Sequence, residues 1–183
     1  MGKIINCRKC NLYKNQPPLI DELKSSDIMW VGLSAKPVGN CQRVQPLAPD
    51  TNSGKIIAMI ERECGKITFY RTNLVKCVPL NENQKLRYPV DHEMKKCCNN
   101  LLLELSTIKP KSVILLGKQV AEFIIKLYNL NPTDKIKYSN YCNTYYKNGI
   151  NFIHVHHPSY MYVYKKKHLT NYVSSIVETI KLI

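Results

Sequence analysis

The side chains best suited to chemistry in this sequence are cysteines, and four of them could meet at one metal centre. Cys7 and Cys10 form a CxxC pair, whose two intervening residues let the backbone curl around an ion or cluster. Cys77 follows an apolar run and Cys97 lies in a helical pattern, so both can join the pair after folding. Four thiolates suit a 4Fe–4S cluster or a structural zinc. Spacing alone leaves a cluster, zinc and no metal open. Cys98, adjacent to Cys97, is an alternative candidate for the fourth ligand. Adjacent side chains on a helix point about 100° apart, so only one of the two can bind the metal centre.

Polar side chains near two predicted strand ends are further candidates for chemistry. Asn73 lies near the carboxyl end of the apolar segment around Phe69, where ligands of open α/β sheets bind. His157 follows another strand, and its imidazole could hydrogen-bond a leaving group or a substrate carbonyl. The alternative is an ordinary surface amide and an exposed loop histidine.

A basic and aromatic segment follows this histidine. Its members are Tyr160, Tyr162, Tyr164, Lys165, Lys166 and Lys167. Lysines that face phosphates and rings that stack on bases are typical of nucleic-acid contacts, although a solvated helix face has a similar composition. The whole chain has 27 Lys and Arg against 13 Asp and Glu, a net charge of +14. This charge favours a polyanionic partner, most commonly nucleic acid, although lysine-rich chains from AT-rich genomes also drift basic.

Length and composition predict one domain in the cytoplasm. A chain of 183 residues is long enough for a substantial core. The start of the sequence has no signal-peptide pattern, and no apolar run reaches the roughly 20 residues of a membrane span. In that compartment the eight cysteines are better interpreted as metal ligands or buried thiols than as disulfides.

Strand and helix patterns that alternate along the chain must position these residues. Apolar runs predict strands over 27–33, from Ile67 to about Asn73, over 112–117 and over 151–155, and Asn148-Gly149 predicts a hairpin turn. Amphipathic patterns predict helices from Thr51, from Asp91, over 118–130 and to about Lys181, with a short one over 19–23. The loop from Lys36 to Asp50 is long enough to be functional. This order predicts an α/β fold, a three-layer αβα sandwich with a mostly parallel four-stranded central sheet.

Five segments in order resemble the uracil-DNA glycosylase superfamily, specifically its iron–sulfur branches, families four and five. They are CRKCNLY, VGLSAKP, TNLVKCVPL, the run from Cys97 through IKPKSVILLG, and HHPSY. The resemblance implies a single domain over residues 1–183 whose N-terminal cysteine segment packs on a 4Fe–4S cluster. In these branches the fourth ligand stands thirteen residues before a proline, a spacing that Cys97 and Pro110 keep. The implied ligands are therefore Cys7, Cys10, Cys77 and Cys97.

The resemblance also implies an activity. The protein would flip uracil, or a related deaminated or modified base, out of double- or single-stranded DNA and remove it by hydrolysis. Asn73 would pair with the Watson–Crick edge of the base, and His157 would stabilise the departing base. Gly32, Leu33 and Ser34 would line the base pocket. We expect a monomer that acts on DNA and not on membranes.

Further residues near the end of the chain are expected to contact DNA. Ser159 would touch a phosphate, and Tyr160 or Met161 would fill the gap left by the base. Lys165, Lys166 and Lys167 would contact the backbone beyond them.

The sequence departs from the family pattern in its first motif. Family four has GEAPG there, whereas this chain has GLSAK and so lacks the acid. Family five takes its acid from a later loop, and Asp50 lies about one residue from that position. We therefore expect Asp50 to be catalytic. The alternative function is a weakly active or inactive protein of the same fold that binds or senses DNA or a modified base.

Overall fold

A computed structural model describes residues 2–39, 44–131, 136–137 and 140–182, in which helices and strands alternate. The elements are α1 (Gly2–Ile5), η1 (Asn11–Lys14), β1 (Ile28–Ser34), α2 (Asn52–Glu63), β2 (Phe69–Val75), α3 (Asp91–Ile108), β3 (Ser112–Leu116), α4 (Lys118–Tyr128), β4 (Ile136–Lys137), β5 (Cys142–Lys147), β6 (Ile150–Val155), α5 (Pro158–Tyr164), η3 (Lys166–His168) and α6 (Leu169–Leu182).

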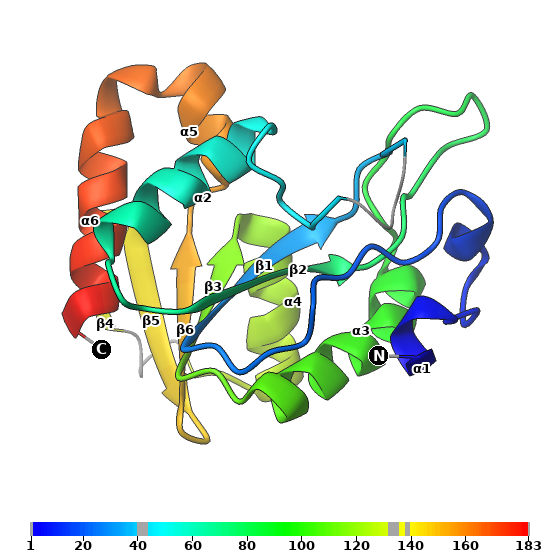
Figure 1. Ribbon diagram of the computed structural model, residues 1–183, viewed down its shortest axis with the longest axis horizontal. Coiled ribbons are helices and arrows are strands. Elements are labelled where there is room, and N and C mark those ends of the chain that lie inside the picture. Colours follow the sequence, from blue (N-terminus) through cyan, green and yellow to red (C-terminus); the bar gives the residue numbers. More distant parts are fainter. Residues whose placement is uncertain (1, 40–43, 132–135, 138–139, 183) are drawn as a thin grey trace.

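The strands form one mixed sheet in the order β2-β1-β3-β6-β5-β4 (Figure 1). The first four of these strands are parallel to one another. β5 pairs antiparallel with β6, and β4 pairs antiparallel with β5. Strand order reverses between β1 and β3, since the chain goes from β1 outward to β2 and then crosses back to β3. Crevices at such reversals, beyond the carboxyl ends of the strands, are the usual ligand sites of open α/β sheets.

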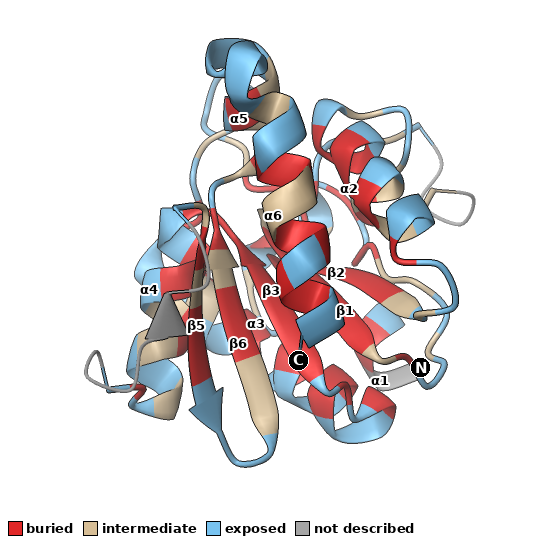
Figure 2. Cartoon of the chain, turned by 90° about the vertical axis from the view of Figure 1, so that its left-hand side faces the viewer, coloured by how far each residue is buried: buried red, intermediate tan, exposed pale blue. Residues whose placement is uncertain are grey.

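Alternate residues of each strand pack on opposite faces of the sheet. In β1, Met29 and Val31 belong to the core beneath α3 and α4, whereas Ile28 and Trp30 belong to the core beneath α2 and α6. Figure 2 shows the buried residues gathered on the strands and on the helix faces that turn towards them. The predicted three-layer α/β sandwich is thus confirmed.

The sheet has six strands, not the four predicted. Its parallel part has the expected four; β5, which the hairpin joins to β6, and β4, which pairs with β5, are the two additional strands. The hairpin turn lies at Asn148 and Gly149, which both have positive φ, as a tight two-residue turn requires.

Most predicted helix starts are correct. The Thr51 hydroxyl accepts a hydrogen bond from Gly54 N and caps α2, and α3 begins at Asp91. The helix predicted over 19–23 is wrong, because Leu19 N donates to Lys76 O and ties this segment, in non-helical form, to the chain after β2. None of the described helices is long and apolar enough to cross a membrane.

Candidate active site

A pocket of about 580 Å³ opens at the carboxyl ends of the parallel strands. The six residues predicted to be catalytic or to bind the base all line it, and they are Gly32, Leu33, Ser34, Asp50, Asn73 and His157. They come from the ends of β1, β2 and β6 and from the loop before α2. Tertiary structure therefore brings together residues that are up to 125 positions apart (157 − 32).

The Asn73 amide lies against the Gly32 backbone. These residues are paired across β1 and β2, and a Cβ on Gly32 would overlap Asn73 Oδ1. Asn73 is only 3% exposed, and no described residue makes a hydrogen bond with its side chain. Buried amides are normally paired, so this amide is available to a ligand in the pocket.

His157 faces the pocket from the start of α5. Its Nδ1 accepts a hydrogen bond from Ser159 N at 3.3 Å, so the neutral ring carries its proton on Nε2. Burial, with a smaller contribution from Lys36, lowers the pKa of His157 below its usual 6.5. A neutral His157 can therefore donate Nε2–H to a ligand near pH 7. The ring packs beside Gly117, where a Cβ would lie 3.2 Å from that of His157.

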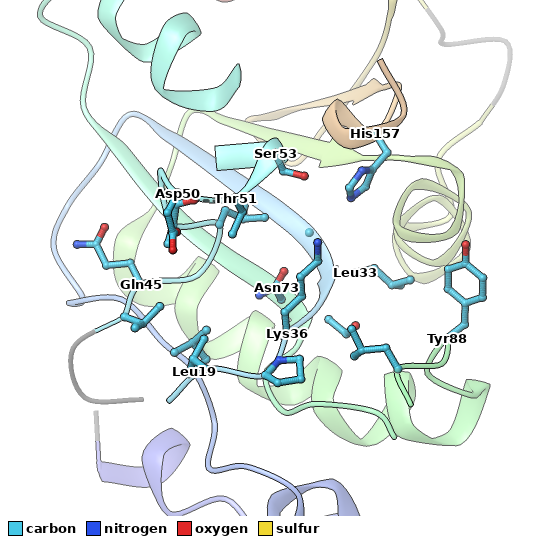
Figure 3. A pocket seen from close by; sticks show the side chains of 18 of the residues that line it. Leu19, Leu33, Lys36, Gln45, Asp50, Thr51, Ser53, Asn73, Tyr88 and His157 are labelled. Atoms are coloured by element: carbon cyan, nitrogen blue, oxygen red, sulfur yellow. Dashed lines mark hydrogen bonds between the residues drawn. The ribbon is translucent and has the colours of Figure 1, made fainter. Parts of the chain in front are cut away.

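Lys36 is a pocket residue that the sequence did not indicate. Its side chain runs past Asn73, and its ammonium end points towards His157 (Figure 3). The backbone around it is held by Gln16, whose side chain accepts from Val38 N at 2.9 Å and donates to Lys36 O at 3.4 Å. A cation at this point favours negative charge on a bound base.

Tyr88 is a second pocket residue that sequence reasoning missed. It is 71% exposed and stands at the mouth of the pocket, on the loop between β2 and α3 (Figure 3). The loop before α2, residues 36–51, has no aromatic residue that could stack on a base. The feature of the sequence that could have indicated Tyr88 is its position, an aromatic residue in the loop that follows β2.

Asp50 lies across the pocket from His157 (Figure 3). Its loop packs closely on α2, because Gly54 has no side chain and a Cβ there would overlap Ala48 O. The predicted functional loop 36–50 thus forms one wall, although its residues 40–43 lie outside those described.

The residues predicted to contact DNA lie beside the pocket and not in it. Ser159 Oγ lies 2.6 Å from Ser53 Oγ, which joins α5 to the pocket wall at Ser53. Tyr160 is 43% exposed and available for contact, whereas the alternative Met161 is buried in the core and cannot be a wedge. The exposed Lys165, Lys166 and Lys167 follow at the end of α5.

The four cysteines implied as ligands line one narrow cavity between the N-terminal segment, the end of β2 and α3. They are Cys7, Cys10, Cys77 and Cys97, and Cys98 is not among the lining residues. The Asn100 amide donates to the sulfurs of Cys7 and Cys97, and Lys76 N donates to Cys97 Sγ at 3.3 Å. Donors around sulfur suit thiolates, and they oppose the burial that raises the pKa of the Cys97 thiol.

These cysteines are candidate ligands of a metal centre. Within the described ranges, no group of three or more His, Cys, Asp or Glu side chains is arranged to hold one metal ion. A zinc would require every sulfur about 2.3 Å from one centre.

Comparisons with known proteins show what this chain is similar to. The sequence profile of the Uracil DNA glycosylase superfamily matches residues 24–181. A Type-4 uracil-DNA glycosylase of Archaeoglobus fulgidus is 26% identical over 163 residues, which cover 86% of this chain and 78% of that protein. Another, from Sulfurisphaera tokodaii, is 24% identical over 164 residues, with 86% and 71% covered. The crystal structure of wild-type SMUG2 from Pedobacter heparinus shares the fold, with a TM-score of 0.61 and 12% identity over 86% of this chain and 76% of that one.

Proposed function

This chain belongs to the uracil DNA glycosylase superfamily, and on that premise we propose that it is a monofunctional DNA glycosylase that removes uracil or a closely related base. The observation that carries the proposal is the Asn73 side chain, which is 3% exposed, has no hydrogen-bond partner among the described residues and lines the same pocket as a neutral His157. One side chain can select the base and the other can assist its departure.

Base selection follows from the two ends of the Asn73 amide. Its NH₂ group can donate to O4 of a flipped-out uracil, and its oxygen can accept from N3–H. Cytosine presents a donor and an acceptor in the opposite places, so an amide held in this orientation would be left unpaired. An unpaired buried polar group costs about 1–3 kcal/mol, which is enough for discrimination.

His157 and Lys36 assist the departure of the base. As the C1′–N1 bond breaks, its electron pair moves onto the base, and O2 becomes negative. His157 Nε2–H donates to that oxygen, and the nearby Lys36 cation stabilises the anion. A water then adds its oxygen to C1′, and the proton that it loses neutralises the departed base anion. We assign the positioning of this water to Asp50, the carboxylate on the far wall of the pocket.

DNA is the partner on which this family acts, and the net charge of +14 suits it. We propose that Tyr160 fills the gap left by the flipped base and that Ser159 and the three lysines after α5 contact the backbone. Tyr88, at the pocket mouth, is placed to stack on the base.

We propose that Cys7, Cys10, Cys77 and Cys97 hold a 4Fe–4S cluster. The shared cavity and the donors to sulfur support this assignment. When bound, such a cluster cross-links the N-terminal segment to β2 and α3, and it takes no part in the steps above.

The experiment that tests the function is a strand-nicking assay on oligonucleotides that contain uracil, hypoxanthine or xanthine, with alkali added after the reaction. The wild type should release uracil, His157→Ala should lower the single-turnover rate by about 10²–10³-fold, and Asn73→Ala should lose base selectivity. Release of none of these bases would reject the proposal.

A second candidate, an inactive sensor of the same fold, is favoured by one observation. The wall at GLSAK presents Ser34 and Lys36 to the pocket and no carboxylate. Tight, selective binding to a modified base without cleavage, measured on the same oligonucleotides, would support the sensor.

A further inference from the structure

Lys76 and Glu104 form an ion pair that is entirely inside the protein. Lys76 Nζ lies 2.5 Å from Glu104 Oε2, and both side chains are 0% exposed. Removing two charges from water is costly, and a buried pair often stabilises a protein no better than apolar side chains of similar size. Stability alone is therefore a weak explanation for this pair.

Every donor and acceptor of the pair is used. The three N–H groups of the Lys76 ammonium reach Glu104, the Thr72 hydroxyl at 2.7 Å and the Asn73 carbonyl oxygen at 2.5 Å. The Glu104 carboxylate also accepts from Tyr70 OH at 2.9 Å and from Thr72 Oγ1 at 3.1 Å. Burial and the neighbouring carboxylate raise the pKa of Tyr70, so its hydroxyl remains a donor. A fully satisfied network of this kind holds its members in one geometry.

The same lysine connects the two candidate sites. Its ammonium bonds the backbone of Asn73, and its own backbone N–H bonds the sulfur of Cys97. Lys76 directly follows the last residue of β2 and directly precedes Cys77, one of the four cysteines. The Asn73 side chain has no hydrogen-bond partner among the described residues, so its direction depends on its own backbone and on the Gly32 surface.

We propose that Lys76 is a positioning residue for base recognition: its buried ammonium, held by Glu104, fixes the Asn73 carbonyl and so aims the Asn73 amide into the pocket. The inference rests on the proposed function, and it adds a residue that does not itself touch the base. A shift of about 1 Å in a recognition group can cost roughly 10²-fold in rate, so a fixed backbone at this point matters.

Three variants separate positioning from stability. Lys76→Met leaves a lone buried carboxylate and should lower the Tm by roughly 10 °C. Glu104→Gln keeps the lysine nitrogen beside the Asn73 carbonyl. The double variant Lys76→Met/Glu104→Gln removes both charges, keeps an acceptor for Tyr70 and Thr72, and should recover most of the lost Tm.

The expected result is a split between folding and recognition. The double variant should fold and contain iron like the wild type, yet its preference for uracil over cytosine in DNA should fall at least about 10-fold. Glu104→Gln should retain that preference, and Lys118→Met, which removes an exposed ammonium from its pair with Glu122, should change nothing. The ratio of kcat/KM values gives the preference, and iron content and Tm are the independent readouts.

Two outcomes overturn the proposal. A double variant with wild-type preference shows that the pair is only structural, and one that has lost its iron shows that the pair acts on the cysteine centre. A wild type that cleaves no substrate is a failure of the proposed function instead. In that case the wild type and the double variant are compared by their binding preference for uracil-containing over cytosine-containing DNA. An equal preference in both, or loss of iron from the double variant, then overturns the inference.

Discussion

The side-chain oxygen of Asn73 occupies the space in which a Cβ on Gly32 would stand. Gly32→Ala should therefore force the Asn73 amide to rotate or the two strand ends to separate. We expect selectivity for uracil over cytosine to fall by about 10-fold or more, since the recognition edge is displaced. Steady-state kinetics on both oligonucleotides measures this. Gly39→Ala is the matched control, because a Cβ there has no neighbour within 4 Å. Equal selectivity in both variants would exclude the contact as a determinant.

The ionisation of His157 should respond to Lys36. Burial, the larger cause, and the Lys36 charge both lower the pKa of His157. Lys36→Met should raise this pKa, though not to 6.5, because the burial remains. NMR titration of the imidazole measures the shift, and Lys111→Met, at the amino ends of the parallel strands, is the control.

The sign of the accompanying stability change follows from the same shift. Because the folded-state pKa is depressed, the unfolded chain takes up a proton first as pH falls below about 6.5. The free energy of unfolding therefore decreases as pH falls from about 6.5 to the folded-state pKa of His157. Lys36→Met should narrow this pH range, because it raises the folded-state pKa. A His157 pKa that is unchanged in Lys36→Met would contradict the geometry in Figure 3.

Asp50→Asn tests the assignment of the water. If the carboxylate positions the nucleophile, the single-turnover rate should fall by about 10²-fold or more while affinity for DNA stays the same. Rapid-quench kinetics and a binding titration separate the two quantities. Asp91→Asn, which removes an exposed carboxylate from its pair with Lys95, is the control. An unaltered rate would remove Asp50 from the mechanism.

Cys97 and Cys98 should behave differently although they are adjacent. Cys97 lines the cavity shared with the other three cysteines, and Cys98 does not. Anaerobically purified wild type and Cys98→Ala should be brown and contain about four irons per chain, whereas Cys97→Ala should lose iron. Iron and sulfide analysis measures this. One zinc and no iron in the wild type would disprove the cluster. Loss of iron in Cys98→Ala but not in Cys97→Ala would show that Cys98, and not Cys97, is the fourth ligand.

Binding to DNA should weaken steeply with salt, and the lysines after α5 should account for part of the slope. Replacing Lys165, Lys166 and Lys167 by alanine should make the slope of log Kd against log salt shallower by roughly one to three units. Fluorescence anisotropy at several salt concentrations measures it. Lys111→Ala, beyond the opposite ends of the strands, should leave the slope unchanged. A triple variant with the wild-type slope would place the DNA elsewhere.

The sequence by itself determined the order of the elements and the residues at their ends. Strand and helix periodicity is local, and so are the cap at Thr51 and the hairpin turn at Asn148-Gly149. Once the strands are known to be parallel, their carboxyl ends must share one edge. Asn73 and His157 could therefore be placed at the same site from sequence alone.

Only the tertiary structure decided which other side chains enter that site. Lys36 and Tyr88 lie in loops, where no periodicity fixes side-chain direction, and the backbone of Lys36 is held by Gln16 from another segment. The ion pair joins Lys76, which directly follows β2, to Glu104 in α3, 28 positions further along the chain. Such contacts depend on how a helix is rotated and seated against the sheet, and packing of the whole core sets that arrangement.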